Sequence, residues 1–361
     1  MDRRREIYLL GFSVFSGIGP VLTRRLLDAF ETAENAWHAD SAGLLAAGLP
    51  EKIIDKFLDF REEFSPQKYA EMLQKKQISF ITPEDKDFPE RLKNLPNCPF
   101  VLYCSGNKKL LNESPSLAVV GTRKITDYGR QVTEQFVEVL STSGLVIVSG
   151  LAMGVDAVAH QTALDCGGKT IAVLGSGVDV CHPSSNRKLY GEIVAKNGLI
   201  VSEYPAGTLP SIGSFPARNR IIAGLTDGVL VTEGALDSGS LITADWAFQL
   251  GRPVFAVPGP VTSALSQGPY ALLEKGGTLA ITPEAILSKF GRKQAPRQKQ
   301  AYPEETDEEK QVRILLMREA MAPDMIVRET GRPVSEISVT LSLMEMKGWV
   351  RQNTSGQYEL A

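Results

Sequence analysis

The chain has 361 residues, of which 43% are hydrophobic and 22% are charged, and its formal net charge is −3. This length suggests two or three domains, and the composition is ordinary for a soluble globular protein. The charge excludes a protein coated in basic surface, but it allows a nucleic-acid-binding protein whose cations gather at one place.

Several classes of protein are not expected. No apolar run reaches the roughly 18–20 residues of a membrane span. Arginines before apolar residues at the start resemble a signal peptide, but residues 17–20 (GIGP) interrupt the apolar part and no cleavage site follows cleanly. Four cysteines without a C-x-x-C pair and only three histidines suggest neither a zinc site nor a disulfide framework. We therefore expect a cytoplasmic protein that uses no metal and no cofactor.

Residues 1–75 are predicted to form a small helical domain. Apolar residues recur at helical spacing around Leu22, Leu26 and Phe30, and again from Ile53 to Leu58. The segment 16–20 (SGIGP) resembles the glycine hairpin of small DNA-binding modules, whose amides approach a phosphate. A turn between two packed helices is the favoured interpretation.

Residues 76–290 are predicted to form a doubly wound α/β domain. Near-continuous apolar runs alternate with helical segments, which is typical of a parallel sheet covered on both faces. Such sheets bind ligands at the carboxyl ends of their strands. The predicted strands carry the sequences LAVV, LVIVS, TIAVL, LIVSE, GVLVT, PVFAV and TLAI.

The rest of the chain is predicted to be a linker and a third domain. Residues 291–305 begin basic and become acidic, without an apolar anchor, and are interpreted as a linker. Residues 306–361 predict a winged helix-turn-helix, with helices over 310–318, from Pro323 and over 334–346, and a hairpin turning at 353–356. The last helix carries Glu336 and Glu345 and no arginine, so a protein-contact or structural role competes with DNA binding.

Loops that follow the predicted strands carry the candidate site. After the first strand, Arg123 and Lys124 follow Gly121 and Thr122, where a dinucleotide-binding loop would have its second glycine. Residues 150–156 form a glycine-rich start to a helix, whose free amides suit an anion. Two cations at such a turn suit a phosphodiester chain lying across the strand ends better than a buried pyrophosphate.

Later loops extend the same pattern. Asn186 follows the third strand, and residues 233–240 form another glycine-rich start to a helix. Arg218 and Arg220 are predicted to open a helix, where they oppose its dipole unless a phosphate lies nearby. Phe215 offers a ring on which a single-stranded base can stack. Together these loops predict an anion cradle rich in amides, arginines and hydroxyls.

Asp156 and His160 lie four residues apart and could form an acid–base pair on one helix face. No nucleophile stands beside them in the sequence, so a structural hydrogen bond is the favoured interpretation. The chain offers no convincing catalytic constellation.

Across residues 80–290 the sequence closely resembles the DprA (Smf) family of bacterial DNA-processing proteins. The resemblance implies a Rossmann-like core between a SAM-like helical domain and a winged helix. It also implies a non-catalytic protein that binds single-stranded DNA, forms homodimers through the Rossmann-like domain and helps load the recombinase RecA during natural transformation. The motifs that carry it are, in order, GTRKITDYG, SGLAMGVDAVAH, IAVLGSGVDVCHP, LIVSEYP, FPARNRIIAGLTDGVLVTEG, SGSLITADWAFQLGR and VFAVPG.

The resemblance places Arg123 in the DNA pocket, through the family's G-[ST]-R motif. Lys124 and Asn186 are added mainly by their position in the sequence. The full set of predicted DNA contacts is Gly121, Thr122, Arg123, Lys124, Ser149, Gly150, Ala152, Gly154, Asn186, Phe215, Arg218, Asn219 and Arg220.

The main alternative is an enzyme that resembles the lysine decarboxylase-like phosphoribohydrolases, which act on nucleoside monophosphates. Their loop reads P-G-G-x-G-T-x-x-E. The corresponding segment here, TEGALDSGSLITADWA, lacks the paired glycines and the downstream glutamate. A scaffold that acts only through its winged helix is a third alternative, and it leaves the arginines unexplained.

Overall fold

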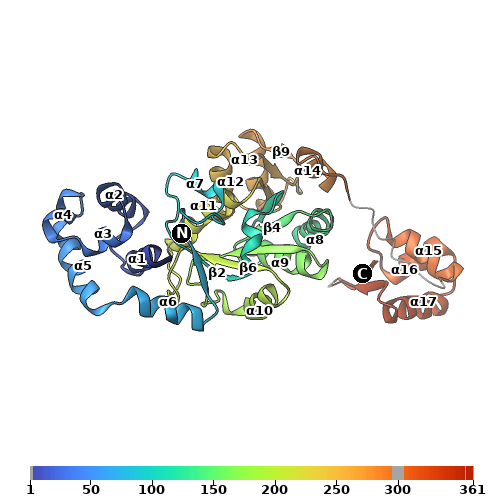
Figure 1. Cartoon of the computed structure of the whole chain (residues 1–361). Coiled ribbons are helices and arrows are strands. Elements are labelled where there is room, and N and C mark those ends of the chain that lie inside the picture. Colours follow the sequence, from blue (N-terminus) through green and yellow to red (C-terminus); the bar gives the residue numbers. More distant parts are fainter. Residues whose placement is uncertain (1–2, 295–304, 354, 361) are drawn as a thin grey trace. The chain divides into compact units, whose positions relative to one another are not determined.

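A computed structural model of the chain describes residues 3–294, 305–353 and 355–360. The chain divides into two compact units, Met1–Ala295 and Pro296–Ala361 (Figure 1). Most of the linker predicted at 291–305 lies outside the described residues. Among the residues that are described, no helix is long and apolar enough to cross a membrane.

The first unit begins with helices that pack around aromatic side chains. The rings of Phe12, Trp37 and Phe57 lie 5.2–5.4 Å apart between centroids. The same hydrophobic cluster includes Tyr103 and Leu174 of the sheet region, so the helices and the sheet share one core. The domain boundary expected near residue 75 therefore stays a prediction. Residues between the first two helices form a turn, as favoured. The helices are α1 (Arg3–Val14), α2 (Pro20–Phe30), α3 (Ala33–His38), α4 (Ser41–Ala46), α5 (Glu51–Glu63) and α6 (Pro66–Lys75).

A sheet with the strand order β1-β2-β6-β5-β4-β3-β7-β8-β9 forms the centre of the same unit. In the part of this order that runs β6-β5-β4-β3-β7-β8-β9, all neighbouring strands are parallel, as predicted. Strands β1 and β2 were not predicted, and they form an antiparallel edge beside β6. The strands are β1 (Ser79–Ile81), β2 (Leu102–Gly106), β3 (Ser116–Val120), β4 (Val146–Ser149), β5 (Lys169–Val173), β6 (Leu199–Ser202), β7 (Gly228–Val231), β8 (Val254–Ala256) and β9 (Thr278–Leu279).

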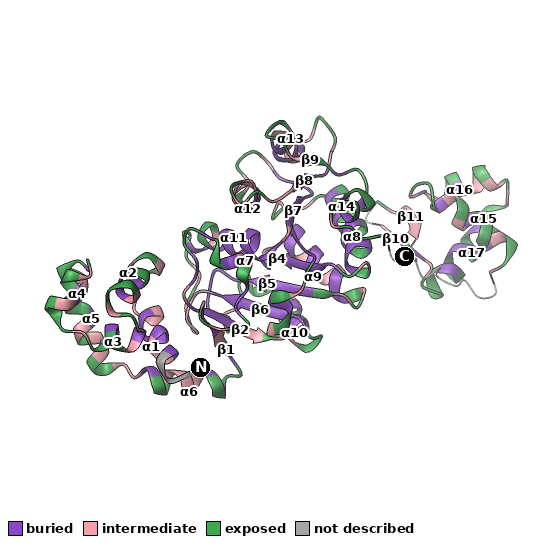
Figure 2. Cartoon of the chain, turned by 45° about the horizontal axis from the view of Figure 1, so that its top comes forward, coloured by how far each residue is buried: buried purple, intermediate pink, exposed green. Residues whose placement is uncertain are grey.

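Helices cover both faces of this sheet because each strand buries residues on both sides. In β3, Leu117 and Val119 pack with α8, α9 and α14, while Ala118 and Val120 pack with α11 and α12. Figure 2 shows the strands buried and the helices exposed on their outer surfaces. The helices are α7 (Glu90–Lys93), α8 (Asp127–Thr142), α9 (Val155–Asp165), α10 (Arg187–Ala195), α11 (Ser214–Leu225), α12 (Gly239–Gln249), α13 (Gln267–Glu274) and α14 (Pro283–Lys289), with short 3₁₀ turns at Lys108–Asn112, Ser184–Asn186 and Ala264–Ser266.

The strand order reverses between β3 and β7. From β3 the chain adds β4, β5 and β6 on one side, and it then returns to add β7, β8 and β9 on the other. Connections that depart in opposite directions leave a crevice at the carboxyl ends of the two central strands, where Rossmann-like folds bind their ligands. This Rossmann-like α/β sheet therefore directs attention to the loops after β3 and β7.

The second unit is a winged helix. Helices α15 (Asp307–Leu316), α16 (Pro323–Thr330) and α17 (Val334–Met346) precede a hairpin of β10 (Val350–Gln352) and β11 (Tyr358–Leu360). Helix α15 begins earlier than predicted because Thr306 and Glu309 form a reciprocal capping box. The predicted bounds of the third helix are confirmed, and its exposed side carries Val339, Leu343 and Met346.

Candidate nucleic-acid interface

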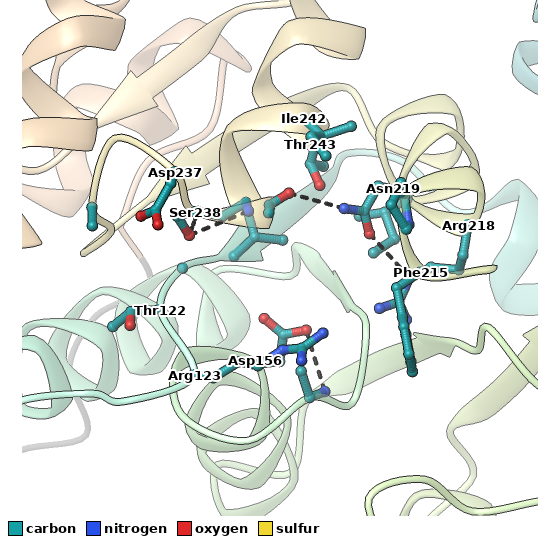
Figure 3. A pocket seen from close by; sticks show the side chains of 18 of the residues that line it. Thr122, Arg123, Asp156, Phe215, Arg218, Asn219, Asp237, Ser238, Ile242 and Thr243 are labelled. Carbon is teal, nitrogen blue, oxygen red and sulfur yellow. Dashed lines mark hydrogen bonds between the residues drawn. The ribbon is translucent and has the colours of Figure 1, made fainter. Parts of the chain in front are cut away.

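A cavity of about 540 Å³ opens where the strand order reverses. Its walls come from the turn after β3, the segment from the loop after β4 into α9, helix α11, and the loop that leads into α12 (Figure 3). Predicted site residues that line it are Gly121, Thr122, Arg123, Ala152, Phe215, Arg218 and Asn219. The fold thus brings together seven residues from three segments distant in the sequence.

The turn after β3 is held by neighbouring backbone. The Thr122 amide donates to the Glu233 carbonyl at 2.8 Å, and the Val155 amide donates to the Thr122 carbonyl at 3.2 Å. Gly121 has no room for a side chain, because a Cβ there would lie 2.6 Å from the Glu233 carbonyl oxygen. Gly154 has a φ of +78°, and its Cβ would lie 2.2 Å from the Thr122 carbonyl oxygen. These glycines therefore fix the loop that presents Arg123.

Arg123 is the exposed cation of the cavity. Its guanidinium lies over the Phe215 ring, 5.3 Å from the ring centroid. Within the described part of the chain, no carboxylate forms an ion pair with it and no acceptor binds its N–H groups. A cation held over an aromatic face with free donors is suited to a phosphate, and the ring beside it is suited to a base.

Arg218 lines the same cavity, but its guanidinium is used inside the protein. The side chain is 5% exposed, and Nη1 donates to the carbonyls of Gly150 (2.6 Å) and Val173. Burial lowers the pKa of Arg218 to about 10, and the nearby Asp156 carboxylate opposes that shift. The structure therefore gives Arg218 a role in tying the ends of β4 and β5 together.

Arg220 does not line the cavity. It is 6% exposed, and Nη2 pairs with a Glu203 carboxylate oxygen at 2.5 Å. The prediction that these arginines open their helix is wrong, because α11 begins at Ser214 and Arg218 stands in its second turn. The Ser214 hydroxyl fixes this start by donating to the Ser211 carbonyl at 2.8 Å. The argument from an unfavourable helix dipole therefore fails, since Arg218 donates to internal carbonyls and Arg220 pairs with Glu203, although Arg220 Nη1 is buried without a hydrogen-bond partner among the described residues.

Other predicted residues support the loops and do not line the cavity. The Ser149 hydroxyl donates to the Val119 carbonyl at 2.7 Å and is fully buried. A Cβ on Gly150 would lie 2.4 Å from the Arg218 guanidinium. Asn186 Nδ2 donates to the carbonyls of residues 151 and 152, at 3.0 and 3.2 Å, and so holds the loop after β4. Lys124 is exposed beside Arg123 but outside the cavity.

Asp156 and His160 have separate partners. The Asp156 carboxylate accepts from the amides of Gly150 (3.0 Å) and Ala152 (3.3 Å), while burial raises its pKa. His160 Nδ1 lies 2.7 Å from the Thr170 hydroxyl, which itself donates to a carbonyl. Burial, with a smaller effect of the Arg218 charge, lowers the pKa of His160 to about 3. Both side chains therefore act as structural supports, but within the described residues no hydrogen bond joins them, and Asp156 also lines the cavity.

The end of the loop after β7 and the start of α12 contribute lining residues that were not among the predicted contacts. Asp237, Ser238, Gly239, Ser240, Ile242 and Thr243 face the cavity opposite α11. Their signal in the sequence was their position just after β7, the partner of β3 at the reversal of strand order. Glu233, from the same loop, is 4% exposed and accepts from the amide and hydroxyl of Thr126 at 3.0 and 2.6 Å. It caps the approach to α8, so the alternative enzyme gains no support from it.

Comparison with known proteins agrees with this architecture. Residues 79–291 match the family described as DNA recombination-mediator protein A, and residues 296–356 match the DprA winged helix domain. Protein Smf of Synechocystis is 35% identical over an alignment that covers 99% of this chain and 100% of that protein.

Solved structures give the same picture. The X-ray structure of DNA processing protein A from Streptococcus pneumoniae has a TM-score of 0.68 at 35% identity, covering 79% of this chain and 96% of that one. DNA processing protein A from Helicobacter pylori, whose structure was described with its single-stranded DNA binding mode, has a TM-score of 0.53 at 36% identity. That match covers 59% of this chain and 95% of the other.

Proposed function

Because the chain belongs to the DNA recombination-mediator protein A family, of which DprA and Smf proteins are members, we propose that it binds single-stranded DNA in the cavity between β3 and β7. The contact between Arg123 and Phe215 carries this proposal. The guanidinium neutralises a phosphate, and the ring stacks on the adjoining base. The Helicobacter pylori relative, named for its single-stranded DNA binding mode, supports the same ligand.

Only some of the predicted contacts belong to this proposal. We place Arg123, Thr122, Phe215 and Asn219 at the DNA, because they line the cavity and are at least partly exposed. Lys124, the next residue in the chain, adds a second exposed cation outside the cavity. Arg218 and Arg220 are left out as ligands, because internal acceptors already engage their guanidinium groups.

The wider role proposed is that of a non-catalytic recombination mediator. It would hold incoming single strands in the cytoplasm, act as a homodimer through the Rossmann-like domain and help load RecA. Family membership supports this role. Light scattering tests the dimer, and RecA filament formation on strands coated by a single-strand binding protein tests the loading. We assign α17 no DNA contact, because its exposed side is apolar and acidic.

The experiment is fluorescence anisotropy of a labelled single-stranded oligonucleotide with wild type and Arg123→Ala at two salt concentrations. The variant should bind at least about tenfold more weakly, since a charge-assisted hydrogen bond contributes roughly 1.5–3 kcal/mol. Its logarithmic salt slope should fall by about 0.7, the value for one phosphate contact on a single strand.

The matched control is Arg25→Ala, which removes an exposed arginine of α2 that does not line the cavity. It should change neither the affinity nor the slope. Equal weakening by both substitutions would mean that only net charge matters. Binding that ignores Arg123→Ala would move the site away from the cavity.

A further inference from the structure

Asp237 is an unexpected residue in a cavity for a polyanion. It lines the wall formed by the start of α12, and its side chain is exposed. No hydrogen bond or ion pair engages its carboxylate within the described part of the chain. A negative charge here repels phosphates, so Arg123 and Asp237 make the two sides of the cavity electrostatically different (Figure 3). A phosphate belongs on the first side and a group with N–H donors on the second.

Only one of the four bases matches a carboxylate well. The Watson–Crick edge of guanine presents two adjacent donors, N1–H and the N2 amino group, to the two oxygens of a carboxylate. In cytosine and adenine the amino group stands next to a ring nitrogen acceptor, and in thymine the single N–H lies between two carbonyls. A carboxylate therefore attracts both donors of guanine and is repelled by an acceptor in each of the others.

Two other residues that line the cavity fit a base in this position. Phe215 on the opposite wall is half-buried, and its ring already meets the Arg123 guanidinium at 5.3 Å and the His182 ring at 5.6 Å. A base stacks on this ring when one of these two side chains turns aside. The amide of Asn219 is fixed, because its Oδ1 accepts from Arg218 Nε at 3.1 Å and its Nδ2 donates to the Gly239 carbonyl at 3.0 Å. One N–H of this amide is left for an acceptor such as guanine O6.

We propose that the cavity accepts one guanine of a bound single strand and that Asp237 selects it. This inference rests on the proposed binding of single-stranded DNA. It names the base that the site prefers, with Asp237 accepting from N1–H and N2, Phe215 stacking and Asn219 donating to O6.

The test compares two labelled oligonucleotides by anisotropy, one of thymidines only and one with a single central guanosine, which cannot form a quadruplex. The wild type should bind the guanosine strand roughly fivefold more tightly, the low end for a bidentate contact, because the Asp237 side chain is exposed to water. Asp237→Asn should abolish this preference and strengthen binding to the thymidine strand, since the repulsion of phosphate disappears.

Glu138→Gln is the matched control, because it removes an exposed carboxylate of α8 that does not line the cavity. It should leave the preference intact. Arg123→Ala should weaken binding to both strands while keeping their ratio.

Equal wild-type affinity for the two strands would overturn the role of Asp237 and leave the proposed DNA site standing. An absence of binding to either strand would overturn the proposed function itself. The role of Asp237 would also be overturned if Asp237→Asn weakened binding to both oligonucleotides in magnesium but to neither in the presence of a chelator. In that case the carboxylate would hold a cation and would not select a base.

Discussion

Replacing Arg218 by methionine should separate this structural arginine from Arg123, the proposed DNA contact. The substitution keeps an apolar stem of similar length and removes the guanidinium. The carbonyls of Gly150 and Val173 then lose their buried donor, and Asp156 loses the positive charge that opposes the effect of burial on its pKa. Each orphaned buried group costs about 1–3 kcal/mol, and loss of a positive charge that favours the buried Asp156 carboxylate adds to this cost. Because these costs overlap, we expect the free energy of unfolding to fall by about 3–5 kcal/mol.

Urea denaturation of the full chain, followed by circular dichroism, measures this loss. Arg123→Met is the matched variant, since it makes the same chemical change at an exposed position. It should shift the free energy of unfolding by no more than about 0.5 kcal/mol, as is usual for surface substitutions. At urea-free conditions where Arg218→Met stays folded, it should bind single-stranded DNA far better than Arg123→Met does.

The opposite pattern would refute this reasoning. If Arg218→Met unfolds at the wild-type urea concentration while its DNA binding is lost, the guanidinium serves the ligand and its internal hydrogen bonds contribute little to stability.

Two further predictions concern the frame of the cavity. Gly154→Ala should destabilise the protein more than Gly144→Ala does, and it should also weaken DNA binding. Both glycines have a positive φ, +78° at Gly154 and +88° at Gly144. A Cβ at Gly154 would lie 2.2 Å from the Thr122 carbonyl oxygen, whereas a Cβ at Gly144 would meet no atom within 4 Å. Urea denaturation and anisotropy of the pair check this, and equal effects at both positions would contradict the clash. Burial lowers the pKa of His160 from 6.5 to about 3, which should make the fold acid-sensitive. Below pH 6.5 the unfolded chain binds a proton at this imidazole and the folded chain does not. The free energy of unfolding therefore stays at its full value above pH 6.5 and falls by up to about 1.4 kcal/mol per pH unit as the pH decreases toward 3. Urea titrations at pH 7 and 4.5 should show a smaller loss for His160→Gln than for wild type, and an equal loss would show that other groups control the acid sensitivity.

The sequence by itself determined the architecture where burial leaves a local pattern. Parallel strands between helices are apolar on both faces, so β3 to β8 were visible as short apolar runs. The bounds of α17 were predicted correctly because Pro333 and Gly348 flank a helical run of residues. The strands β1 and β2 were missed, since they form an antiparallel edge whose pairing depends on β6, a neighbour about a hundred residues away in the sequence.

The tertiary structure alone decided which arginine is exposed in the cavity. Arg123, Arg218 and Arg220 carry the same charge and stand in similar motifs, so the sequence could not rank them. Packing exposes the first over Phe215 and buries the other two against carbonyls and Glu203. Asp237 entered the site only because the reversal of strand order places the start of α12 across from the turn after β3. The partners of these side chains come from segments distant in the sequence, so a local sequence pattern cannot predict them.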